Sequence, residues 1–169
     1  MPQLLASSGH ADAPRIAIDN LDTLHLVFGD SPAGLSGPYR IRYTCAHGAD
    51  GAFLPPMTIA SAAGVSLNFP NLSVDRSGRF FVTWQTASSA EVPSRGIGFT
   101  ISRNRGRSFA PAEIVPRSDD PRLGVNGSQQ GSLMTRLAVN SEGTLAIVNS
   151  TCASGRSSRI WLWRRSTRP

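Results

Sequence analysis

Apolar and polar residues alternate over short stretches of the chain, which is the pattern of half-buried β-strands. The clearest stretch has Leu72 and Val74 between polar neighbours, a turn over residues 75–78, and alternation again from Phe80 to Trp84. A third alternating stretch covers residues 97–101 and a weaker one residues 112–115. Turn residues separate these stretches, so the pattern predicts a unit of four antiparallel strands.

The unit is repeated along the chain. A shift of 56 residues places Pro14–Asp19 on Pro70–Asp75 without a gap, and the later strand positions also coincide. At a shift of about 65, Arg136–Asn140 repeats the opening strand a third time. The extra length is predicted to lie in the loop Arg117–Gln130, which is rich in Gly, Ser, Asn and Asp.

Four antiparallel strands repeated at a fixed period are typical of β-propeller blades. We therefore predict an all-β chain, a single propeller segment over residues 1–169 with about three blades, at residues 11–61, 67–116 and 131–169. A β-sandwich with accidental repetition and another repeat fold are the alternatives.

The residues between the third and fourth strands of the second unit carry a family resemblance. The stretch Ser102–Phe109 resembles the Asp-box, Ser-x-Asp-x-Gly-x-x-Trp/Phe, of the sialidase-like (bacterial neuraminidase repeat) propellers. Asn104 stands where the family has Asp, which is a mild change because Asn also accepts the hydrogen bonds of a turn. The resemblance implies a structural role for four residues, which are Ser102, Asn104, Gly106 and Phe109.

The ends of the chain suggest a permuted blade. Residues 2–7 resemble 56–61, the fourth strand of the first unit, so residues 1–8 are predicted to be the fourth strand of an incomplete blade. Three blades cannot close around an axis. We expect two chains to form a six-bladed homodimer, and the alternative is that the sequence is a piece of a longer gene.

Composition narrows the classes of function. The net charge of +6 arises from 17 Arg and no Lys, a bias that does not by itself indicate nucleic-acid binding, and the Arg-rich residues 156–168 fit a solvated strand. No apolar run approaches the roughly 20 residues of a membrane span. No signal peptide is visible in residues 1–9, which leaves both secreted and cytoplasmic locations open.

No cofactor or metal is expected. Cys45 and Cys152 lack the spacing of zinc ligands, and two free thiols are favoured over a disulfide between them. The three His residues also lack metal-ligand spacing, and no Gly-rich phosphate loop or nucleophile elbow occurs.

Sialidase-like glycosidases bind the substrate carboxylate with arginines near the propeller axis. The resemblance therefore makes Arg15 and Arg136, at inner-strand starts, and Asn71, at the equivalent position between them, candidate ligand-binding residues for an anion. Arginines that cap strands in solvent are the alternative. Asp119 and Asp120 are candidate acids if their loop folds over the channel, and otherwise they are turn residues.

No set of residues supplies both an acid/base group and a nucleophile at matched spacing, so no catalytic residue is assigned. The sequence therefore favours a non-catalytic module that binds a glycan or a protein. Its binding elements would be the central channel and three loops, Ser31–Pro38, Ala87–Arg95 and Arg117–Gln130. A sialidase-like glycoside hydrolase fragment or subunit is the alternative, and a scaffold without a known ligand is a third reading.

Overall fold

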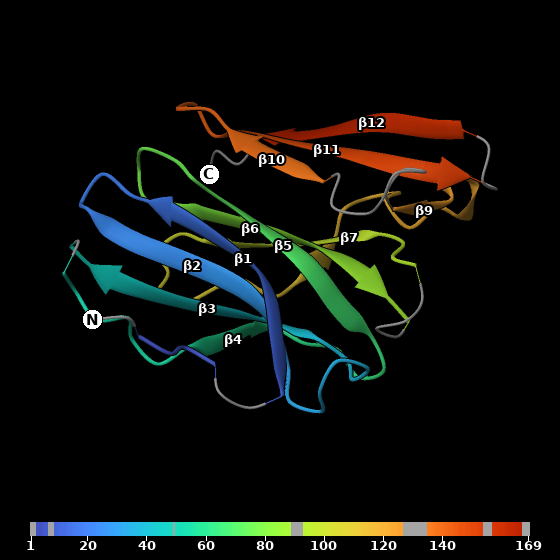
Figure 1. The fold of residues 1–169 in the computed structure, drawn as a ribbon. Coiled ribbons are helices and arrows are strands. Elements are labelled where there is room, and N and C mark those ends of the chain that lie inside the picture. The colour runs from blue at the N-terminus through green and yellow to red at the C-terminus, as the bar shows by residue number, and fades with distance from the viewer. Residues whose placement is uncertain are drawn as a thin grey trace.

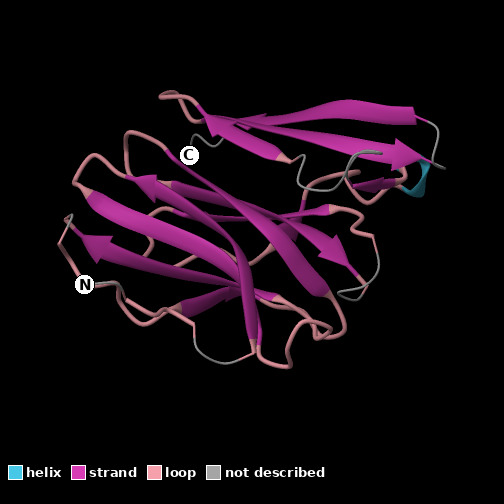
Figure 2. Ribbon diagram, in the orientation of Figure 1, coloured by secondary structure: helices cyan, strands magenta, loops and turns pink. Residues whose placement is uncertain are grey.

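The computed structural model describes residues 3–6, 9–48, 50–88, 93–126, 135–153 and 157–166. These residues form three antiparallel sheets of four strands each, which confirms the predicted all-β blade architecture (Figure 1). The described part of the chain contains one short 3-10 helix, η1 (Pro121–Leu123), and no helix long enough to cross a membrane (Figure 2).

The first two sheets have the simple order of a blade, with each strand hydrogen-bonded to the next in the chain. The first sheet contains β1 (His10–Ile18), β2 (Thr23–Ser31), β3 (Arg40–His47) and β4 (Met57–Ala60). The second sheet contains β5 (Ser66–Val74), β6 (Phe80–Ala87), β7 (Ile97–Ser102) and β8 (Glu113–Ile114). The first strands β1 and β5 contact each other, and β5 also contacts the corresponding strand of the third sheet, as expected of strands around an axis.

The third sheet has an interrupted inner strand. It contains β9 (Val125–Asn126), β10 (Arg136–Val139), β11 (Thr144–Ala153) and β12 (Ser157–Ser166). Both β9 and β10 pair with β11 along the same edge, β9 opposite Thr151 and Cys152 and β10 opposite residues 145–148. Val125 and Asn126 thus belong to this sheet although they precede residue 131, where the sequence predicts the third blade to begin.

The interruption falls where the other two inner strands have a bulge. The register of β1 shifts between Asp12 and Arg15, and that of β5 shifts between Asn68 and Asn71. In each bulge a residue with positive φ precedes a proline: Ala13 at 49° and Phe69 at 53°. The extra length of the third unit is predicted in Arg117–Gln130, and residues 127–134, between β9 and β10, lie outside the described residues.

Two apolar clusters fill the spaces between sheets. The cluster between the first and second sheets includes Val27, Ile41 and Trp84, and the cluster between the second and third includes Phe81 and Ile147. Burial of these side chains, at about 1.5–3 kcal/mol each, is the main force that stacks the blades.

Cys45 and Cys152 are free cysteines.

The N-terminal residues lie against the first blade. Residues 3–6 are not in a strand, and the Gln3 side-chain amide exchanges two hydrogen bonds with the Phe53 backbone, of 2.8 and 2.7 Å. The strand predicted over residues 1–8 is therefore absent at residues 3–6. The reason is that Gln3 satisfies backbone groups beside the β3–β4 connection instead of extending a ladder.

An acidic or amide side chain closes the hairpin between the first two strands of every blade. Asp19, Asp75 and Asn140 each accept hydrogen bonds from the backbone N–H groups two and four residues further on, at 2.8–3.1 Å. Short side chains of this kind stabilise turns by replacing backbone hydrogen bonds. The repeat therefore preserves turn chemistry as well as strand pattern.

His25, next to the first of these turns, gives a prediction for pH dependence. Burial disfavours the charged imidazole and lowers the pKa of His25, although Asp19 partly opposes the shift. A lowered folded-state pKa means that the unfolded chain binds more protons below pH of about 6.5. We expect the free energy of unfolding to fall as pH drops below this value, with a slope of up to about 1.4 kcal/mol per pH unit for this proton. Urea denaturation of wild type and His25→Gln from pH 5 to 8 should show the slope reduced in the variant; equal slopes would contradict this assignment.

Candidate functional site: a pocket at the blade ends

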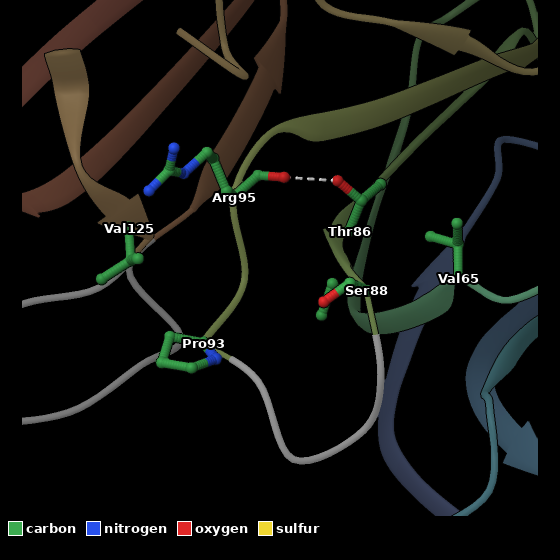
Figure 3. A pocket seen from close by; sticks show the side chains of 7 residues that line it. Val65, Thr86, Ser88, Pro93, Arg95 and Val125 are labelled. Carbon is green, nitrogen blue, oxygen red and sulfur yellow. Dashed lines mark hydrogen bonds between the residues drawn. The ribbon is translucent and has the colours of Figure 1, made fainter. Parts of the chain in front are cut away.

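The blade topology places several loops at one end of the molecule, which we call the loop face. In each antiparallel blade the connection between the second and third strands lies at the end where the inner strand begins. At this face a pocket of about 460 Å³ opens beside the second blade (Figure 3). Its lining residues come from the starts of two inner strands and from both sides of the β6–β7 loop: Val65, Thr86, Ala87, Ser88, Pro93, Arg95 and Val125.

Arg95 is the charged group of this pocket. Its backbone is fixed to the end of β6, because its N–H donates to the Thr86 carbonyl at 2.7 Å and its carbonyl accepts from Thr86 Oγ1 at 2.6 Å. The side chain is exposed, and no carboxylate among the described residues forms an ion pair with it. A rigid backbone thus holds an arginine fork, suited to a carboxylate, beside hydroxyl and apolar groups. Arg95 ends the predicted binding loop Ala87–Arg95, but it was not among the predicted ligand-binding residues.

The two predicted acids have different surroundings. Asp119 is exposed and lies against Gly96: a Cβ built on that glycine would be 3.2 Å from the Asp119 Cβ. Asp120 instead caps η1, accepting from the Arg122 backbone N–H at 2.9 Å and pairing with its guanidinium at 2.7 Å. The side-chain and backbone hydrogen bonds of Arg122 lower the pKa of Asp120 to about 2. Asp120 is therefore held ionised, which does not suit a general acid, while Asp119 lies next to Gly96, the residue after Arg95, and is not among the lining residues.

The inner strands position the three residues predicted to bind an anion near the propeller axis. Arg15 and Arg136 each donate a hydrogen bond of 2.9 Å to the carbonyl of the preceding residue, Pro14 and Thr135. Asn71 Nδ2 donates to the same Thr135 carbonyl at 2.9 Å across the gap between blades. The fold thus brings Asn71 and Arg136 together at one oxygen, whereas no hydrogen bond of the described residues joins Arg15 to either.

A buried polar seam lies between the second and third blades and was not found from the sequence. Gln85 Nε2 donates to Thr135 Oγ1 at 3.3 Å, which donates to Asn149 Oδ1 at 2.6 Å. Gln85 and Asn149 are fully buried. Polar side chains on strands with apolar alternation carry no sequence signal for such a seam, because their partners come from another blade.

One tyrosine lies near the loop face beside titratable groups. The Tyr39 hydroxyl is hydrogen-bonded to His10 Nδ1 at 2.6 Å, and its backbone N–H donates to Ser66 Oγ at the start of β5. Burial and the charge of Asp12 raise the pKa of Tyr39. A nucleophilic tyrosine requires its hydroxyl to lose a proton readily, so this environment works against catalysis by Tyr39.

Among the described residues no group of three His, Cys, Asp or Glu could hold a metal ion.

The loop Ser102–Phe109 is closed by its own side chains. Ser102 Oγ accepts from the Gly106 N–H at 2.8 Å, and Asn104 Oδ1 accepts from the Ser108 N–H at 2.9 Å. Phe109 packs against Tyr43 of the first blade, with ring centroids 5.0 Å apart. The four residues of the Asp-box resemblance, Ser102, Asn104, Gly106 and Phe109, lie at the end of the blade opposite the loop face. Their contacts are those of a structural loop.

No family model and no curated protein matches the sequence. Among solved structures, the fold is similar to a Hadza microbial sialidase, with a TM-score of 0.64 and 14% identity over 93% of this chain. It is also similar to a thermostable family-43 glycoside hydrolase, with a TM-score of 0.52 and 12% identity over 95% of this chain. The chain spans 35% and 56% of those two proteins. At these identities the likeness establishes the fold, that of β-propeller blades of the kind found in glycoside hydrolases.

Proposed function

We propose that this chain is a non-catalytic propeller module that binds an acidic sugar in the loop-face pocket. The observation that carries the proposal is Arg95, an exposed guanidinium without an ion pair among the described residues, set between Thr86 and apolar walls. A sugar ring presents apolar C–H faces and hydroxyls, and a carboxylate fits the guanidinium fork. Both structural neighbours are glycosidases by name, which supports a sugar as the ligand class.

The binding role is tested by a glycan array with matched variants. Charge-assisted hydrogen bonds contribute about 1.5–3 kcal/mol, so Arg95→Gln should weaken binding of acidic glycans by roughly 10- to 100-fold. Arg76→Gln changes an exposed arginine in the hairpin turn at the opposite end and serves as the control. Equal loss in both variants, or preferential binding of neutral glycans, would contradict the proposal.

A glycoside hydrolase subunit or fragment is the second candidate, favoured by the Asp-box resemblance and by the names of the neighbours. The raised pKa of Tyr39 and the ion-paired Asp120 count against it. Hydrolysis of a fluorogenic sialoside by the wild type, abolished in Arg15→Ala, would favour this candidate and would assign a role to the arginines near the propeller axis. We expect no turnover.

We further propose that two chains associate into a closed propeller through the uncovered faces of their first and third blades. Phe80 and Val82 of the second blade are fully buried against a neighbouring blade. Their repeat equivalents in the first blade are Leu24 and Leu26, which are only half-buried, on the face turned away from the second blade. Ile160 and Leu162 on the third blade are 77% and 55% exposed. Covering such surfaces is favourable.

The association predicts a solution mass near twice the 18.0 kDa of one chain. Size exclusion coupled to light scattering measures it. A charge placed at the interface, Leu26→Asp, should shift the mass to that of a monomer, whereas a wild-type monomer would rule out the dimer.

A further inference from the structure

A second cleft, of about 610 Å³, lies at the end of the blades opposite the loop face. It opens between the β1–β2 turn, the end of β3 and the loop after β7. Its volume falls in the range of small-molecule sites. It shares no lining residue with the loop-face pocket.

The floor of the cleft is polar, and most of its groups contact one another, although buried His25 Nε2 has no hydrogen-bond partner among the described residues. The Tyr43 hydroxyl is hydrogen-bonded to His25 Nδ1 at 2.7 Å, and His25 Nε2 lies 3.5 Å from Asp19 Oδ2. Asp19 also pairs with Arg105 Nη1 at 3.0 Å. The Asp19 carboxylate and the Arg105 guanidinium therefore neutralise each other, and neither charge is left for a ligand.

The rim leaves one positive charge uncompensated. Arg107 is exposed, and within the described ranges its guanidinium has neither an ion pair nor a hydrogen bond. Beside it the cleft exposes three apolar side chains, Leu21, Leu54 and Met57, at 62%, 53% and 40%. One unpaired guanidinium next to an apolar wall is complementary to a molecule with one negative charge and an apolar body.

We propose that this cleft binds a small organic monoanion, with its carboxylate on Arg107 and its apolar body against Leu21, Leu54 and Met57. A multiply charged ligand is disfavoured because Arg105 already serves Asp19. The loop bearing Arg107 lies directly on the cleft floor: a Cβ built on Gly106 would be 1.9 Å from the Tyr43 hydroxyl, and the Gly106 N–H donates to Ser102 Oγ at 2.8 Å. This site is independent of the sugar site at the other end of the blades.

The proposal is tested with phenylacetate and its neutral isostere phenylacetamide, in an NMR titration that follows the Met57 methyl group. We expect phenylacetate to shift this signal and the amide to bind at least about 10-fold more weakly, the loss expected when a charge-assisted pair is removed. Arg107→Gln should reduce phenylacetate binding to the level of the amide. Arg103→Gln, an exposed arginine of the same loop outside the cleft, should leave it unchanged.

A second variant tests the apolar wall. Leu54→Asp introduces a negative charge at a half-exposed position and should weaken phenylacetate binding without unfolding the protein, since the Leu54 backbone bond to Cys45 remains. Equal binding of acid and amide would overturn the proposal. So would an Arg107→Gln variant that binds like Arg103→Gln, or no shift of Met57 at tens of millimolar ligand.

Discussion

Replacing Gly106 with alanine is expected to lower the free energy of unfolding by about 3 kcal/mol, since strain and overpacking add at one position. Gly106 has φ of +80°, which costs a residue with a Cβ roughly 1 kcal/mol. A Cβ there would also lie 1.9 Å from the Tyr43 hydroxyl. Tyr43 is held by His25 and Phe109, so it cannot simply move away.

Gly48→Ala separates the two contributions. Gly48 has φ of +71° but no atom within 4 Å of a built Cβ, so only the backbone term of about 1 kcal/mol applies. Urea denaturation followed by tryptophan fluorescence measures both variants. If both variants lose a similar free energy of unfolding, the loop that bears Gly106 does not lie directly on Tyr43. The described contact between the first two blades would then be wrong.

Gly98→Ala is expected to cost about 2–3 kcal/mol through packing alone, the upper part of the range for overpacked cores. Gly98 has no positive φ, but a Cβ on it would lie 2.0 Å from Trp84 Nε1 and 2.2 Å from Cε2. The indole therefore lies directly on the Gly98 backbone, and its 2% exposure leaves it no room to turn outward.

A double-mutant cycle tests the source of this cost. Trp84→Phe removes the indole Nε1 that a Cβ at Gly98 would meet, so Gly98→Ala should cost less in the Trp84→Phe background by at least about 1 kcal/mol. Thermal or urea unfolding of the four proteins gives the coupling energy. Additive effects would mean that the indole is not the obstacle.

The blade architecture could be predicted from the sequence because the information is local. Alternation from Phe80 to Trp84 defines a strand, and Asp75 with Gly78 defines its turn. The third unit has Asn140 with Gly143 at the same positions, and the first has Asp19 with Asp22. The 56-residue shift also aligns the two bulges, since Ala13 and Phe69 occupy the same position of the repeat. Neither residue type by itself predicts a positive φ.

The site was harder to predict because its residues are joined only by contacts between blades. The pocket sets Arg95 beside Val65 and Val125, and the periodic pattern says nothing about which inner-strand starts meet. The strand β9 was not predicted for a similar reason: Val125–Asn126 is too short to show alternation and becomes a strand by pairing with the edge of β11. Asp120 gave a partial signal, since Asp followed by Pro indicates the cap that the structure contains.

Binding of an acidic sugar at the loop face is tested by a backbone-amide NMR titration with sialyllactose, using lactose as the neutral control. We expect sialyllactose to shift the signals of Thr86, Arg95 and Val125, and these shifts should disappear in Arg95→Gln and persist in Arg76→Gln. Shifts confined to Arg15 and Arg136 would move the binding site to the propeller axis. No shift with sialyllactose, or equal shifts with lactose, would contradict the binding of an acidic sugar at the loop face.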